Sequence, residues 1–211
     1  MVDKQRESTL VEPELTQSAE ADHGESLRGL LSLVRLQESC PPVSLSDAML
    51  RAQGQILTLS AIEHQSVGVG WDGLMSASDW CASFTDSIER GYGNSVNIAF
   101  SGRSDARISA SGAHSLGLVL GELLSDACER SMRNNPCPWI EVALVEERPG
   151  RLKLSVRDES PSSEIPLVAA MLSASMGIDL LDRFGAERTE RDLVFSPRAL
   201  GEYSEGQSSL S

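Results

Sequence analysis

The most informative pattern of apolar residues in the chain lies within residues 116–132. Apolar side chains recur there every three or four positions, as on a helix packed on one side, at Leu116, Val119, Leu120, Leu123, Leu124 and Ala127. Glu122 and Asp126 are four residues apart, so they share a side of this helix that is distinct from the apolar stripe. Two carboxylates in this arrangement can hold a divalent cation, or they can simply lie in solvent.

Two further helical patterns come earlier in the chain. Residues 25–39 carry leucines and a valine at helical spacing, and Pro41 and Pro42 end this pattern because proline lacks a backbone donor. The next helix has apolar residues three or four apart at Leu45, Met49, Ala52, Ile56, Leu59 and Ile62. We expect residues 25–68 to form a helical hairpin that pairs with a second copy in a dimeric four-helix bundle. The alternative is that the hairpin packs on its own chain.

The rest of the chain alternates between helical and strand patterns. The sequence predicts a helix over 78–92, strands over 95–100 and 107–109, the helix with two carboxylates, a hairpin of strands over 139–146 and 152–157, a polar loop over 158–166, a helix over 168–181 and a strand over 193–195. This order indicates an α/β sandwich over residues 75–198, with helices on one face of a mixed sheet. Residues 1–24 and 199–211 are polar, and we expect a disordered arm and a flexible tail there.

Composition narrows the classes of partner. The 211 residues carry a net charge of −13, which argues against nucleic acid and against an anionic membrane surface. No apolar run is long enough to span a membrane, and the first residues lack the apolar core of a signal peptide. The four cysteines form no C-x-x-C pair, so we expect reduced thiols and a cytoplasmic location.

Four segments, in their order along the chain, carry a resemblance to a known family. The end of the family's first hairpin helix resembles residues 32–37, and its N box resembles residues 116–127. The strand leading into its G1 box resembles residues 152–158, and its G2 segment resembles residues 176–181. Together they resemble a histidine kinase core of the subgroup-2 or HWE type, over about residues 25–197. The resemblance implies an α+β fold, in which a dimerisation hairpin precedes a GHKL ATP-binding domain. It also implies a homodimer that binds the receiver domain of a response regulator.

The resemblance also suggests roles for individual residues. Glu122 matches the acid of the N box, and Asp126 occupies the position of the asparagine that holds Mg²⁺ in the family. Asp158 matches the residue that receives the adenine amino group, and Gly177 is the one glycine left of the G2 segment. These four residues form the expected nucleotide site, with Asp126 as its metal ligand.

The chain departs from the family at several of these positions. Gly121 replaces a second N-box asparagine, and Glu129 replaces a basic residue, although Arg130 is adjacent. The G1 box normally reads Asp-x-Gly-x-Gly, whereas residues 158–162 read Asp-Glu-Ser-Pro-Ser. Serines and a proline restrict the close backbone approach that glycines allow.

The phosphoacceptor position of the family is also altered. Ala21 stands where the family has its histidine, and His23 is the candidate acceptor nearby. Two residues turn a side chain by roughly 200° about a helix axis, so His23 would point away from the expected face.

The sequence therefore predicts a two-component signalling protein with absent or weak Mg-ATP binding. Its expected role is that of a pseudokinase or a phosphotransferase-like adaptor in a phosphorelay. One alternative is an active ATP-dependent histidine kinase with divergent motifs. A second alternative is a GHKL-type anti-sigma or partner-switching protein, which would lack the hairpin over residues 25–66.

Overall fold

The structure, a computed structural model, describes residues 44–66, 73–162, 166–184 and 188–197. The expected arm, the first hairpin helix with His23 before it, and the C-terminal tail lie outside the described residues. The described elements, in chain order, are helix α2 (Leu45–Ser66), strand β1 (Leu74–Ser76), helix α3 (Ala77–Gly91), the 3-10 helix η1 (Gly93–Ser95), strands β2 (Asn97–Gly102) and β3 (Arg107–Ser109), helix α4 (Ala110–Asn134), strands β4 (Trp139–Arg148) and β5 (Arg151–Asp158), helix α5 (Leu167–Ser175), and strands β6 (Asp179–Phe184) and β7 (Thr189–Phe195).

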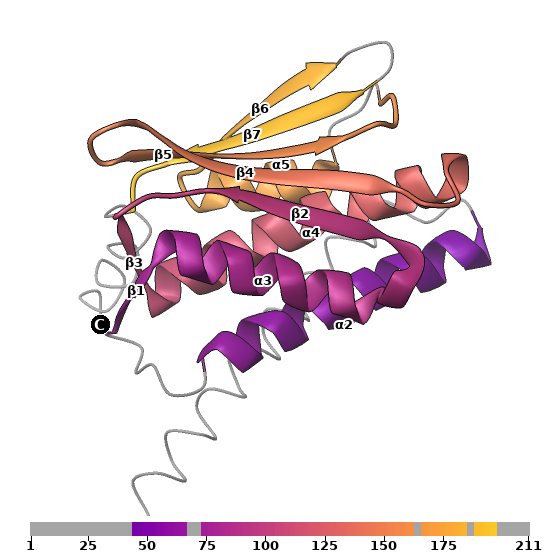
Figure 1. Ribbon diagram of the computed structural model, residues 1–211, viewed down its shortest axis with the longest axis horizontal. Helices are drawn as coiled ribbons and strands as arrows, with labels where there is room; N and C mark the ends of the chain where they lie inside the picture. Colours follow the sequence, from indigo (N-terminus) through magenta and orange to yellow (C-terminus); the bar gives the residue numbers. More distant parts are fainter. Residues whose placement is uncertain (1–43, 67–72, 163–165, 185–187, 198–211) are drawn as a thin grey trace, which may run out of the picture. The chain divides into compact units, whose positions relative to one another are not determined.

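A five-stranded mixed sheet in the order β2-β4-β5-β7-β6 forms one layer of the molecule. Strand β2 runs parallel to β4, and every other neighbouring pair in this sheet is antiparallel. Helices α3, α4 and α5 cover one face of the sheet, as Figure 1 shows, and α2 lies on the far side of α3 and α4. The predicted sandwich, with helices on one face of a mixed sheet, is confirmed.

Helix α4 is the centre of the core. All six residues of the predicted apolar stripe, from Leu116 to Ala127, are fully buried. The side chain of Ser109 caps the helix by accepting a hydrogen bond of 3.0 Å from the backbone N–H of Gly112. The helix is longer than predicted because this cap lies seven residues before Leu116.

Helices α2 and α4 approach each other closely through glycines. A Cβ atom added to Gly121 would lie 2.3 Å from the side chain of Thr58, and one added to Gly54 would lie 2.2 Å from Oγ of Ser125. Gly117 meets Ile62 in the same way, at 2.8 Å. Gly121, which stands where the family has a second N-box asparagine, therefore has a packing role: a larger side chain would push the helices apart.

Helix α2 presents two different faces. The face with Gly54, Gln55, Thr58 and Ala61 is buried against α3 and α4, as in the alternative in which the hairpin packs on its own chain. The predicted apolar seam starts on the opposite face, where Leu45, Met49 and Ile56 are 78%, 67% and 63% exposed. The last two steps of the seam, to Leu59 and to Ile62, are both three residues, so Ile62 lies roughly 100° around the helix from Leu45 and is buried.

The predicted helix over residues 168–181 is wrong in its second half. Helix α5 ends at Ser175, and Gly177 follows with a φ of +66°, a conformation that favours glycine. The backbone N–H of Ile178 donates to the carbonyl oxygen of Ser173 at 2.9 Å, which closes the helix end. Residues 179–184 then form strand β6, which pairs with β7 at the edge of the sheet.

Candidate functional site

The two carboxylates of α4 engage different partners. Glu122 Oε1 accepts a hydrogen bond of 3.4 Å from Gln55 Nε2 on α2, and burial raises the pKa of Glu122. Asp126, one turn later, forms ion pairs with arginines of α4 and β7 instead. The structure therefore does not bring Glu122 and Asp126 together as a pair of metal ligands.

Arg191 lies at the centre of the site. Strand β7 alternates, so Thr189, Arg191, Leu193 and Phe195 share one face of the sheet, and Arg191 is 1% exposed. Its guanidinium donates to Asp126 Oδ2 at 2.6 Å through Nη1, to Asp182 Oδ1 at 2.9 Å through Nε, and to Ser162 Oγ at 3.3 Å through Nη2. One arginine thus joins α4, β6 and the segment after β5.

Arg130 provides a second cation beside Arg191. It lies one turn after Asp126 on α4 and forms ion pairs with Asp126 and with Asp158, the latter at 2.7 Å. Burial lowers the pKa of both Arg130 and Arg191, and the neighbouring carboxylates oppose this effect. We call Asp126, Arg130, Asp158, Asp182 and Arg191 the interior charge cluster; its three carboxylates and two guanidiniums leave one net negative charge.

Hydrogen bonds of Ser160 hold the altered G1 segment, residues 158–162, in place. Asp158 Oδ1 accepts a hydrogen bond of 3.0 Å from the backbone N–H of Ser160, and Ser160 Oγ lies 3.2 Å from Ser131 Oγ on α4. Thr189 Oγ1 donates to the carbonyl oxygen of Ser160 at 2.7 Å. The serine that replaces the first glycine of the motif is therefore buried between α4 and β7.

The predicted nucleotide residues divide into three groups. Asp126 and Asp158 are brought together, through Arg130, in the interior charge cluster. Glu122 faces α2, and Gly177 forms the turn between α5 and β6. Asp182 and Arg191 were missed by the sequence analysis, although one signal was present: Arg191 occupies a position of β7 that the alternation assigns to the core.

The contacts of Asp126 fit a divalent cation poorly. Its Oδ2 atom already forms ion pairs with two guanidiniums, whereas a hard cation requires several oxygens that are not paired with other cations. Within the part of the chain that the structure describes, no group of three or more His, Cys, Asp or Glu side chains is arranged to hold a metal ion.

Comparisons with known proteins found similarity at the level of structure. No family model matches the sequence, and no curated protein matches it. The histidine kinase domain of the blue-light activated histidine kinase EL346 from Erythrobacter litoralis is similar, with a TM-score of 0.56 and 12% identity, over 84% of this chain and 99% of that one. A longer structure of the same kinase gives a TM-score of 0.60 and 12% identity, over 91% of this chain and 62% of that one.

No helix among the described residues has the length and apolar character needed to cross a lipid bilayer.

At 12% identity, the likeness to the two kinase structures concerns the fold. The order of elements, the mixed sheet and the helices on one of its faces agree with it. The chain has the α+β, GHKL-like fold of a histidine kinase core.

Proposed function

We propose that this chain is a cytoplasmic two-component signalling protein that has lost ATP-dependent kinase activity. It would act as a pseudokinase or a phosphotransferase-like adaptor that binds the receiver domain of a response regulator. One observation carries the proposal: Asp126 and Asp158, to which the family resemblance assigns Mg²⁺ and adenine, both form ion pairs with arginines of the interior charge cluster.

The physical argument is competition for the same oxygen atoms. A metal ion on Asp126 or an adenine amino group on Asp158 would have to displace Arg130 or Arg191 from its carboxylate. A buried charge that loses its partner costs about 3–5 kcal/mol. The nucleotide would have to supply this free energy without the glycines of the G1 box.

Calorimetric titration of the intact chain with Mg-ATP tests the loss of nucleotide binding. We expect no saturable heat up to millimolar nucleotide. The variant Asp158→Asn and the surface control Asp79→Asn should behave as the unmodified chain does. Saturable binding at micromolar nucleotide that disappears in Asp158→Asn alone would favour the alternative of an active kinase with divergent motifs. Autophosphorylation with labelled ATP would then be the next measurement.

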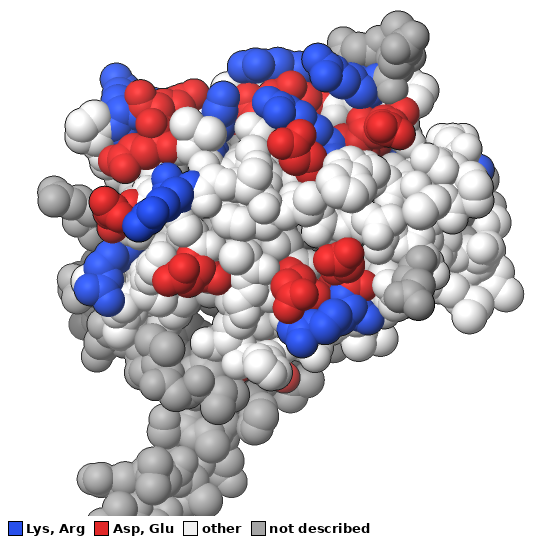
Figure 2. Space-filling view, in the orientation of Figure 1, with Lys and Arg blue, Asp and Glu red and all other residues white. Residues whose placement is uncertain are grey.

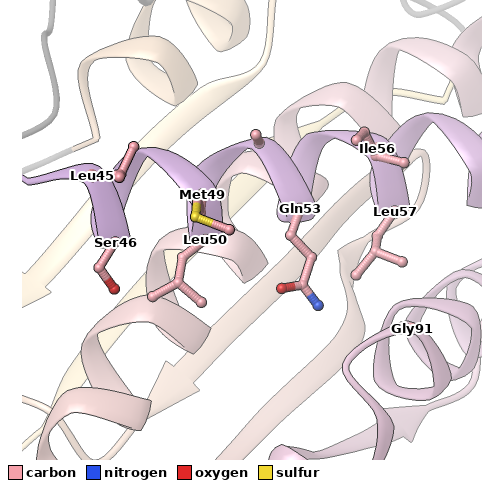
Figure 3. Close-up of a pocket in the computed structure, with 9 residues that line it drawn as sticks. Leu45, Ser46, Met49, Leu50, Gln53, Ile56, Leu57 and Gly91 are labelled. Atoms are coloured by element: carbon pink, nitrogen blue, oxygen red, sulfur yellow. The ribbon is translucent and has the colours of Figure 1, made fainter.

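The exposed face of α2 supports a homodimer. Leu45, Met49, Ile56 and Leu57 line an apolar groove of about 810 Å³ that reaches Gly91 at the end of α3 (Figure 3). The 43 residues before the described part of the chain include the apolar helical pattern of residues 25–39. Two prolines separate this pattern from the start of α2 in the sequence. We propose that the groove packs against a second copy, as part of a four-helix bundle.

Light scattering on size-exclusion fractions tests the homodimer. Met49→Glu with Ile56→Glu places two charges in the groove, so we expect the mass to fall from that of two chains to that of one. Ser83→Glu on the exposed side of α3 is the matched control and should keep the dimer. An unmodified chain with the mass of a monomer at all concentrations would contradict the proposal.

Phosphotransfer is the second part of the proposed role. A phosphorylated receiver domain mixed with the chain should bind it, and a phosphotransferase should also take up the phosphoryl group. Transfer that is lost in His23→Ala and kept in His64→Ala would identify His23 as the acceptor. Binding without transfer would identify a pseudokinase adaptor, and neither binding nor transfer would contradict both roles.

A further inference from the structure

The interior charge cluster has a consequence beyond the loss of ATP binding. In the proposed function a nucleotide is absent, yet α4, the segment after β5 and the strand pair β6–β7 still have to be held together. Arg191 contacts a side chain from each of them: Asp126, Ser162 and Asp182. All three of its donor nitrogens are used, and the side chain is almost completely buried.

We propose that Arg191 is a built-in substitute for a bound ligand, and that its guanidinium keeps this site assembled without a nucleotide. Arg191 is then the positioning residue for residues 158–162. This inference rests on the proposed function, because a chain that binds Mg-ATP at Asp126 and Asp158 would need no such substitute.

The hydrogen bonds around Arg191 support this role. Charge-assisted bonds from a planar guanidinium are directional and fix the geometry of several acceptors at once. The segment after β5 is also held by Ser160, through Asp158, Ser131 and Thr189. Arg191 adds the contact to Ser162 and connects this segment to α4 and β6 through the same side chain.

An arginine also suits phosphate binding, so a competing interpretation must be tested. Arg191 could be a group that takes the phosphates of a nucleotide. Each of its three nitrogens donates to a protein acceptor, and two of these acceptors are carboxylates. A phosphate would have to displace these anions and would meet Asp126, Asp158 and Asp182 around it, which is why we favour the internal role.

Amide hydrogen exchange on the intact chain, followed in peptides by mass spectrometry, tests the inference. Arg191→Met removes the guanidinium. The double variant Arg191→Met/Asp182→Asn removes both charges of this ion pair, so no unpaired carboxylate is left at position 182. It can be measured in place of the single variant if Arg191→Met alone prevents folding. The matched control, Arg157→Met with Glu190→Gln, removes an ion pair of 3.1 Å between β5 and β7 on the opposite face of the sheet.

In both Arg191 variants we expect exchange in a peptide covering residues 158–162 to become at least about ten-fold faster. Exchange in peptides of the β4–β5 hairpin should change much less, and the control pair should leave residues 158–162 within about two-fold of the unmodified chain. A uniform increase over all peptides, or no change at residues 158–162, would overturn the inference, because a merely stabilising ion pair gives the first result.

The same experiment with 1 mM Mg-ATP, and with ATP and a chelator, separates the inference from the proposed function. Neither addition should slow exchange at residues 158–162 in the unmodified chain. Slowing by Mg-ATP would show that the proposed loss of nucleotide binding is wrong. Slowing by ATP without metal that is lost in the Arg191 variants would show that Arg191 binds phosphate, and would overturn its role as a substitute.

Discussion

Strands β5, β7 and β6 carry acidic and basic residues on both faces of the sheet. The two sets are similar in composition but differ in how far their side chains are exposed. On the outer face, Glu141, Arg157, Glu190 and Arg183 follow one another across β4, β5, β7 and β6, with ion pairs of 3.5, 3.1 and 3.7 Å. On the helix-covered face, Arg191 and Asp182 are neighbours on β7 and β6 and join the interior charge cluster. Glu190 and Arg191 are adjacent in the sequence.

Burial separates the two sets. The side chains of Arg157 and Arg183 are 38% and 62% exposed, whereas those of Arg191 and Asp158 are 2% exposed. Figure 2 shows acidic and basic side chains intermingled on the sheet side of the molecule. Exposed pairs are screened by water and contribute little, while a buried ion that loses its partner is strongly destabilising. The face of the sheet on which an arginine lies therefore determines how much free energy of unfolding its replacement costs.

The largest expected effect is that of Arg191→Met. It leaves Asp126 without one of its two cations and takes the paired guanidinium away from Asp182, so we expect the free energy of unfolding to fall by about 3–5 kcal/mol. Urea denaturation followed by circular dichroism measures this change. Arg157→Met, on the next strand but the other face, is the matched control. Equal losses in the two variants would refute the distinction between the faces.

Asp158→Asn should have the second largest effect. The amide keeps an oxygen that can accept from the backbone N–H of Ser160 but loses the charge that faces Arg130. We expect the free energy of unfolding to fall by about 2–3 kcal/mol, since hydrogen bonds to charged groups are stronger than neutral ones. Asp79→Asn, at an exposed position of α3, is the control for urea denaturation, and a loss no larger than its own would contradict the prediction.

The distance along the sequence between interacting residues explains which features the sequence could predict. The stripe of α4 and the β4–β5 hairpin were predicted because their periodicity lies within a few consecutive residues. The interior charge cluster could not be found in this way, since Asp126 and Arg191 are 65 residues apart and meet only through the fold. Its members Asp126 and Asp158 were identified by their motifs, but the motifs indicated a nucleotide and not the ion pairs of these carboxylates with Arg130 and Arg191.

The errors in the predicted elements have local causes. Residues 176–181 contain apolar side chains that continue the helical pattern of α5, so the pattern predicts one helix as far as Leu181. In the structure, the positive φ of Gly177 reverses the chain and begins strand β6, which brings Asp182 to Arg191. Strand β1 has three residues, too few for a periodic signal.

The pH dependence of stability should have opposite signs on the two faces. Burial raises the pKa of Asp182 above its ordinary value, despite the opposing effect of Arg191. Burial would also raise the pKa of Glu190, but the hydrogen bond and charge of Arg157, with Arg183 and Lys153, bring it below its ordinary value. The folded chain therefore holds the proton of Asp182 more tightly than the unfolded chain does, and that of Glu190 less tightly.

We therefore expect Glu190 to contribute stability above its ordinary pKa of 4.5 and to lose that contribution as the pH falls through its folded value. Asp182 should act in the other direction: its contribution decreases as the pH rises from 3.8 through its raised folded value. Urea denaturation between pH 3.5 and 6.5 measures both, with Glu190→Gln and Asp182→Asn as variants. Each variant should remove its own slope, and slopes of the same sign would contradict the assignment.

The smallest effect, and the sharpest test of the contrast, is the salt dependence of Arg157→Met. Its pairs with Glu141 and Glu190 lie on the outer face, so we expect a loss of at most about 1 kcal/mol in low salt. At 1 M salt the screening length falls to about 3 Å, and this loss should shrink toward zero. The loss in Arg191→Met should remain nearly unchanged, because water and salt do not reach a side chain that is 2% exposed. If salt reduced both losses by the same fraction, the two sets of charges would share one dielectric environment, and the difference in burial would have no energetic meaning.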